Sequence, residues 1–141
     1  MSDLLEIKDL RIRFRVKSML KAFLDRDSDP YIDAVCGASL SIKRGETFAL
    51  VGESGAGKTT LARSILGLVQ PASGSIQYKG ESLLGLGDKA FKPLRREIAM
   101  MFQDPAGCLS PRLTVRTIIT EPYRIHAVRD VNYDREAARL L

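Results

Sequence analysis

The residues most able to do chemistry form one short stretch near the middle of the chain. They follow the pattern Gly-x-x-x-x-Gly-Lys-Thr, with Gly52, Gly57, Lys58 and Thr59 at its fixed positions. Glycines in such a loop let successive backbone N–H groups surround phosphate oxygens without Cβ atoms in the way. We expect Lys58 to donate to the β- and γ-phosphates of a nucleotide, and the Thr59 hydroxyl to bind Mg²⁺.

The predicted ligand set extends over the whole loop, because the first amides of the following helix have no intrahelical acceptors and lie at the positive end of its dipole. It comprises Gly52, Glu53, Ser54, Gly55, Ala56, Gly57, Lys58, Thr59 and Thr60. A glycine turn that binds nothing is the competing interpretation. It would leave a nest of amides facing solvent without acceptors from the protein.

The flanking pattern suits a loop that joins a strand to a helix. Residues 47–51 form a short, mainly apolar run, which is typical of a strand buried on both faces of a parallel sheet. Between residues 61 and 69 apolar side chains recur at helical spacing, and Pro71 ends that helix. A second apolar run, residues 98–102, predicts another buried strand.

The N-terminal third predicts two strands, residues 4–16 and 34–42, joined by a polar connector over residues 17–30. Residues 11–17 alternate cationic and apolar side chains, as a half-buried edge strand does. This favours a solvated strand face over a nucleic-acid surface, because only 6% of residues are aromatic and no recognition motif occurs.

The C-terminal part predicts a strand at 74–78, a mixed, partly helical stretch at 82–96, and a helix from residue 114 that Pro122 ends. Residues 133–141 predict another helix. No glycine, asparagine or proline follows to cap it, so we expect the sequence to stop within that helix.

Composition indicates one soluble globular domain. The chain has 141 residues, 45% of them hydrophobic, and a net charge of +5. Its apolar runs reach about five residues, far short of the roughly twenty that span a bilayer. Asp3 and Glu6 argue against a secretory signal, so a cytoplasmic location is expected. We expect Cys36 and Cys108 to be small buried side chains, and we expect no metal held by side chains alone.

Taken together, the motifs resemble the ATP-binding subunits of ABC transporters, and among them the oligopeptide and dipeptide importer type. The resemblance rests on residues 45–60, on Ile-Leu-Gly-Leu at 65–68, and on Met-Phe-Gln-Asp-Pro at 101–105 with Leu-Ser-Pro-Arg-Leu-Thr-Val at 109–115. It implies that Gln103 is the Q-loop glutamine, which reaches toward Mg²⁺ and the attacking water. It also implies that an aromatic side chain stacks on adenine, with Phe14 at the matching place and Tyr31 as a second candidate. Ordinary packing is the alternative for both.

The resemblance further implies an α/β P-loop NTPase fold, with a mainly parallel sheet and a small N-terminal antiparallel β part. Residues 1–141 would be the N-terminal part of one such domain, with ATP and Mg²⁺ as ligands. The implied partners are transmembrane permease subunits, a second ATP-binding subunit and, indirectly, a solute-binding protein. The implied location is peripheral, on the inner face of the cell membrane. No nucleic-acid partner is implied.

Several parts of the family pattern do not occur in these residues. There is no Ser-Gly-Gly-Gln signature and no apolar run followed by Asp-Glu, and His126, the single histidine, precedes the place of the family's switch histidine. We expect His126 to be a solvated side chain. Because groups that position water and neutralise charge are missing, we expect nucleotide binding with negligible hydrolysis.

Two alternatives remain open from the residues alone. A small complete GTPase or nucleotide kinase would need Asp104 as a second Mg²⁺ ligand, and Gln103 intervenes between it and the apolar run. A GTPase would also carry Asn-Lys-x-Asp, whereas the single asparagine, Asn132, precedes tyrosine. The other alternative is a non-catalytic binding or regulatory fragment that folds against a partner.

Overall fold

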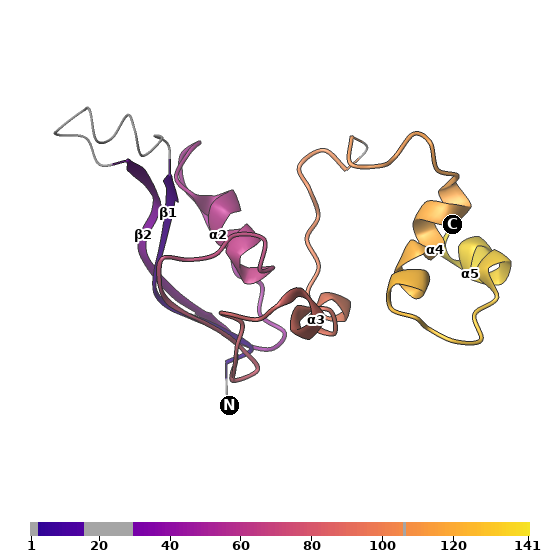
Figure 1. Cartoon of the computed structure of the whole chain (residues 1–141), viewed down its shortest axis with the longest axis horizontal. Coiled ribbons are helices and arrows are strands. Elements are labelled where there is room, and N and C mark those ends of the chain that lie inside the picture. The colour runs from indigo at the N-terminus through magenta and orange to yellow at the C-terminus, as the bar shows by residue number, and fades with distance from the viewer. Residues whose placement is uncertain (1–2, 16–29, 106) are drawn as a thin grey trace. The chain divides into compact units, whose positions relative to one another are not determined.

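The computed structural model describes residues 3–15, 30–105 and 107–141. The chain forms two compact units, Met1–Gly87 and Asp88–Leu141, each of which holds its own elements (Figure 1). The connector predicted for residues 17–30 lies outside the described residues except for Pro30. Within the described ranges, no helix combines the length and the apolar character needed to cross a membrane.

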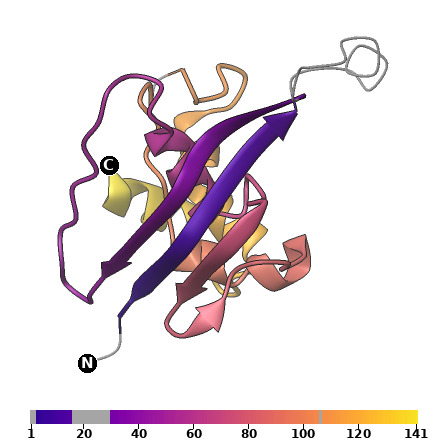
Figure 2. The same cartoon turned by 90° about the vertical axis from the view of Figure 1, so that its left-hand side faces the viewer.

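The first unit is built on a four-stranded sheet with the order β2-β1-β3-β4 (Figure 2). The strands are β1 (Leu5–Arg15), β2 (Tyr31–Ile42), β3 (Ser73–Tyr78) and β4 (Glu81–Ser82). All three pairings between these strands are antiparallel. The N-terminal antiparallel part and the strand at 74–78 that the sequence predicts are therefore confirmed.

The core of this unit follows from the alternation along β1. Leu5, Ile7, Leu10 and Ile12 are buried, and a register shift between Ile7 and Leu10 keeps all four on the covered face. Ile76 of β3 is paired with Ile7 and is fully buried beside it. Each such side chain contributes about 1.5–3 kcal/mol by leaving water, so β1 at the centre of the sheet carries most of the hydrophobic stabilisation.

Two predicted strands are not formed. Residues 47–51 and 98–102 are not assigned to any strand, and Val51 and Met101 are 90% and 85% exposed. A parallel strand is stable where neighbours complete its hydrogen-bond ladder and helices cover both faces. The described residues supply no such neighbours, so the parallel part of the expected sheet is absent from them.

The prediction that both cysteines are buried was also wrong. Cys36 and Cys108 are free thiols and both are exposed. Cys36 lies on β2, which is an edge strand of the sheet, and Cys108 lies in the loop before Thr114.

The second unit contains short helices. They are α3 (Asp88–Phe91), the 3₁₀ helix η1 (Leu94–Arg96), α4 (Val115–Ile125) and α5 (Tyr133–Leu140). The side chain of Thr114 accepts a hydrogen bond from the Thr117 amide at 3.2 Å and so caps α4. Asn132 caps α5 in the same way, accepting from the Arg135 amide at 3.0 Å. Both caps satisfy amides that a helix start leaves unpaired.

Helix α4 continues past Pro122, although the sequence predicts that the helix ends there. Proline removes one backbone hydrogen bond, at a cost of about 3 kcal/mol inside a helix. The next turn still forms, because the His126 amide donates to the Pro122 carbonyl at 3.0 Å. The side chains of this turn also pack on α5, and this tertiary contact outweighs the local preference.

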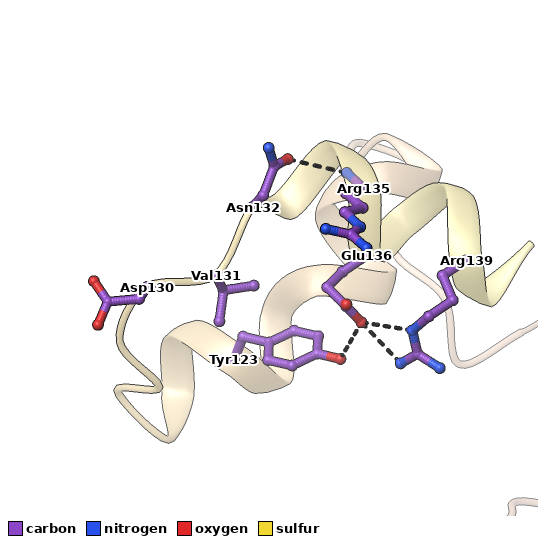
Figure 3. A pocket seen from close by; sticks show the side chains of 7 residues that line it. All are labelled: Tyr123, Asp130, Val131, Asn132, Arg135, Glu136 and Arg139. Carbon is purple, nitrogen blue, oxygen red and sulfur yellow. Dashed lines mark hydrogen bonds and ion pairs between the residues drawn. The ribbon is translucent and has the colours of Figure 1, made fainter.

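A cluster of hydrogen bonds holds α4 against α5 (Figure 3). The Glu136 Oε2 atom accepts from the Tyr123 hydroxyl at 3.0 Å and from Arg139 Nε and Nη2 at 2.9 and 2.8 Å. A second link joins Arg116 Nε to Asp134 Oδ1 at 2.5 Å. The donors from Arg139, and then from Tyr123, lower the pKa of the Glu136 carboxyl.

This cluster predicts an acid-sensitive link between the two helices. Because the folded-state pKa of Glu136 lies below its ordinary value of 4.5, its contribution is complete above that pH and is lost as the pH falls through the folded pKa. An NMR titration of the Glu136 carboxyl should therefore show a midpoint below 4.5. Tyr123→Phe should raise that midpoint by removing one donor. A wild-type midpoint at or above the ordinary value would contradict the hydrogen bonding described.

Candidate functional site

The phosphate loop predicted from the sequence leads directly into helix α2 (Lys58–Ile65). Gly57 is the N-cap of this helix, with a left-handed backbone at φ 82°, and no side chain caps the helix start. The amides of the first turn are donors without intrahelical acceptors. An anion at this helix start would therefore find free donors and the positive end of the helix dipole.

Strand β2 supports the loop at Gly57. A Cβ atom added at Gly57 would lie 2.2 Å from the Ala34 carbonyl oxygen and 3.2 Å from Val35 Cγ2. Only glycine fits so close to another backbone. At Gly55, which also has a positive φ of 86°, an added Cβ would have no neighbour within 4 Å. The two glycines thus share a conformation, but only Gly57 fixes the start of α2 on the sheet.

The side chain of Lys58 folds back over the loop. Its Nζ donates to the carbonyl oxygens of Gly52 at 2.7 Å and Glu53 at 2.6 Å. The Ala56 amide donates to the Glu53 carbonyl at 3.2 Å and closes the same turn. An ammonium has three N–H donors, so one remains for a ligand. The charge is therefore placed inside the loop before any phosphate binds.

The residues at the start of α2 suit a magnesium nucleotide. Thr59 is exposed in the first helical turn and Thr60 is half-buried beside it. A hydroxyl oxygen is a hard ligand of the type that Mg²⁺ accepts, while phosphate oxygens and water complete its octahedron. Among the described residues, no group of three or more His, Cys, Asp or Glu could hold a metal ion. A hydroxyl working with the nucleotide's own oxygens therefore fits these residues.

An open cavity of about 470 Å³ lies between β2 and the loop. Residues 33–38 of the strand line one side, and Gly55 with Ala56 lines the other. Val35 pairs with the buried Ile12 of β1 and approaches Gly57, so this face of the two strands is the one that meets the loop. A ligand bound at the loop therefore has space beside it for groups larger than phosphate.

The register of β1 and β2 separates the two aromatic candidates. Phe14 lies two residues after Ile12 and shares its face, which is the face that meets the loop, and it is 43% exposed. Tyr31 pairs with Arg15 on the opposite face. There the Arg13 guanidinium lies over the Tyr31 ring, 5.5 Å from its centre, and Arg13 also pairs with Asp33. The geometry therefore favours Phe14 over Tyr31.

Gln103 belongs to the second unit. It is exposed and follows residues 98–102, which form neither helix nor strand, in the bend that also holds Asp104. The Asp104 Oδ1 atom accepts a hydrogen bond from the Gly107 amide at 3.0 Å and shapes this turn. The role of Gln103 near Mg²⁺ and water stays a prediction.

Comparison with known proteins identifies the family to which this chain belongs. Residues 35–141 match the family described as ABC transporter. The chain belongs to that family. The ABC assignment confirms the predicted P-loop NTPase fold. The ATP-binding cassette MJ0796 bound to ADP and Pi superimposes with a TM-score of 0.76 at 23% identity, covering 96% of this chain and 53% of the other.

Two curated ABC relatives are more similar in sequence. The oligopeptide transport ATP-binding protein OppF of Escherichia coli (strain K12) is 42% identical over 123 residues, which is 87% of this chain and 36% of that protein. The nickel import ATP-binding protein NikE of Shigella flexneri is 51% identical over 86 residues, covering 61% of this chain and 32% of NikE. The chain thus spans about a third of the length of the curated relatives it matches.

Sequence reasoning missed the part of β2 that supports the loop. Ala34 and Val35 take part through a carbonyl oxygen and a methyl group, and neither residue type marks a functional position. The second fixed glycine of the motif, Gly57, could have indicated them, because a glycine at a fixed position suggests that another part of the chain packs closely against its backbone.

The contrast between the two glycines predicts different costs for the same substitution. Gly57→Ala and Gly55→Ala both place a Cβ at positive φ, but only Gly57→Ala drives it into the β2 backbone. We expect Gly57→Ala to reduce the free energy of unfolding by about 1–3 kcal/mol more than Gly55→Ala, as overpacking does. Urea denaturation followed by circular dichroism measures both. Equal losses would show that the loop does not rest on β2.

Proposed function

We propose that this chain is the nucleotide-binding part of an ABC transporter ATPase that energises the import of peptides or another small solute. The observation that carries the proposal is the Lys58 ammonium, held inside the glycine loop at the uncapped start of α2. The names of OppF and NikE concern oligopeptides and nickel, so the class of solute stays open between peptides and other small solutes.

The loop would bind the triphosphate through backbone and side-chain donors together. Amides of the loop and the first turn of α2 donate to phosphate oxygens, and the free N–H of Lys58 adds a charge-assisted bond of about 1.5–3 kcal/mol. Thr59 would hold Mg²⁺ through its hydroxyl, and the cation would supply charge neutralisation for the phosphates. Phe14, on the face that meets the loop, stacks on the adenine ring.

Hydrolysis by these residues alone is expected to be negligible. Gln103 could orient water, but the 141 residues contain neither a signature sequence nor an Asp-Glu pair after an apolar run. Phosphoryl transfer depends on placing the nucleophile and neutralising developing charge, and half of the groups that position the reactants are missing from these residues.

Membership of the family supports the transport assembly that we propose. It contains transmembrane permease subunits, a second ATP-binding subunit and, indirectly, a solute-binding protein. In it the chain is peripheral, on the inner face of the cell membrane. The chemical energy of ATP would be passed on through the segment that carries Gln103.

The nucleotide proposal is tested by calorimetric titration of the 141-residue chain with MgATP. Lys58→Ala should weaken binding at least about tenfold, because it removes a charge-assisted hydrogen bond to phosphate. The control variant is Lys43→Ala, which removes the same charge from an exposed turn outside the loop. It should change MgATP binding little.

Three results would contradict the proposal. The first is a flat titration for the unmodified chain. The second is displacement of bound ATP by GTP at a lower concentration than by ATP itself, which would favour the GTPase alternative. The third is steady phosphate release by the purified chain that Lys58→Ala abolishes, which would disprove the expectation of negligible hydrolysis.

The adenine contact has its own test. Phe14→Ala should weaken MgATP binding about tenfold, since stacking of a base on an aromatic ring contributes about 1–3 kcal/mol. Tyr31→Ala should leave MgATP binding almost unchanged, because Tyr31 lies on the opposite face under Arg13. Magnesium tripolyphosphate, which lacks a base, serves as the control ligand and should bind both variants alike. A larger loss for Tyr31→Ala would reverse the assignment.

A further inference from the structure

A cavity of about 390 Å³ lies between the end of α4 and the start of α5, within the unit Asp88–Leu141 (Figure 3). Its lining comes from Tyr123 of α4, from residues 130–132 of the connection, and from Arg135, Glu136 and Arg139 of α5. This volume falls within the roughly 300–1,000 Å³ typical of small-molecule sites. The lining residues lie outside the phosphate loop, so the cavity is a second candidate site.

Hydrogen bonds hold the walls of this cavity in place. The Glu136 carboxylate accepts from Tyr123 and Arg139, which ties α4 to α5 and balances the charges of Glu136 and Arg139. The Asn132 side chain caps α5 through its oxygen, which leaves its NH₂ group for another acceptor. The Val128 amide donates to the Tyr123 carbonyl oxygen at 2.9 Å and fixes the turn after α4. A ligand would therefore enter a largely preformed site.

Two opposite charges at this cavity have no ion pair. Over residues 3–15, 30–105 and 107–141, the Asp130 carboxylate and the Arg135 guanidinium make neither an ion pair nor a side-chain hydrogen bond. In Figure 3 the two side chains lie on opposite sides of Val131, and the Asp130 carboxylate is turned outward. Asp130 is exposed, so its side chain changes rotamer within nanoseconds and can turn toward a ligand.

The surface between these two charges is largely apolar. It is formed by the half-buried Val131 side chain and by the ring of Tyr123, whose hydroxyl already donates to Glu136. An apolar ligand group placed there would remove both surfaces from water. The cavity is therefore complementary to a molecule without net charge that has a carboxylate at one end, an ammonium at the other and an apolar body.

We propose that this cavity binds a short apolar peptide with free termini, of about dipeptide length, with its carboxylate at Arg135 and Asn132 and its ammonium at Asp130. The position of Val131 between the charges favours a peptide over an amino acid. An amino acid carries both charged groups on one carbon, whereas each further residue adds about 3.5 Å between them. That such a peptide is the imported solute rests on the proposed function, whereas recognition of its termini does not.

NMR titration of the 141-residue chain with the dipeptide Leu-Leu tests the site. Asn132 is the single asparagine, so isotope labelling of asparagine alone gives one backbone amide and one side-chain amide to follow. Leu-Leu should shift these signals in a saturable way. It should bind at least about tenfold more tightly than leucine, Leu-Leu-amide or N-acetyl-Leu-Leu, because each of these loses one charge-assisted contact.

Charge variants assign the two ends of the peptide. Arg135→Gln should weaken Leu-Leu binding about tenfold and leave Leu-Leu-amide binding unchanged, because the amide has no carboxylate. Asp130→Asn should weaken Leu-Leu binding but not N-acetyl-Leu-Leu binding, because the acetylated peptide has no ammonium. Arg129→Gln and Glu121→Gln are the controls, since they remove the same charges from exposed positions outside the lining. Both should retain Leu-Leu binding.

Peptide binding and nucleotide binding are read separately, because Arg135→Gln should bind MgATP like the unmodified chain. The proposal fails on any of three results. One is the absence of a saturable shift of the Asn132 signals with Leu-Leu. Another is leucine binding as tightly as Leu-Leu, which would show that the separation of the charges is not recognised. The last is an equal loss of Leu-Leu binding in Arg129→Gln and Arg135→Gln, which would indicate attraction by overall charge.

Discussion

The close approach of the Gly57 backbone to the Ala34 carbonyl is the constraint on which the candidate site depends. It fixes where α2 begins relative to β2, and so where the free amides of the helix start are directed. Strand β1 lies between β2 and β3 and its apolar side chains are buried, so the antiparallel pair of β1 and β2 is held in place by the sheet and the core. A loop that holds an anion needs such a fixed base, because donors that move lose their advantage over water.

Local patterns of the sequence were enough to predict the loop, the helix that follows it and the N-terminal strands. Eight consecutive residues specify the loop from Gly52 to Thr59, and the alternation of residues 11–17 belongs to the strand predicted for residues 4–16, which is β1, because both signals lie within one segment. Residues 47–51 and 98–102 were predicted wrongly for the opposite reason. An apolar run shows that a segment can be buried, but the strands that would cover it are a property of distant residues.

Tertiary contacts also explain the remaining differences. Proline ends many helices, yet α4 extends through Pro122 because Tyr123 in the next position is held by Glu136 of α5. No sequence pattern links residues 123 and 136 in advance, since their pairing requires the turn between the helices. The hydrogen bond from Arg96 to the His126 carbonyl could not be predicted for the same reason, because the two residues are thirty positions apart in the sequence.

The position of the Lys58 side chain affects the rate of ligand binding and the conformational entropy that is lost on binding. A free lysine loses up to about 2 kcal/mol of rotamer entropy when it is immobilised. Here the two carbonyl contacts at Gly52 and Glu53 impose that order during folding. A polyphosphate that binds would thus contact an ammonium that is already oriented. The barrier to binding would then come from removing water from the phosphate and the ammonium, and not from ordering the lysine side chain.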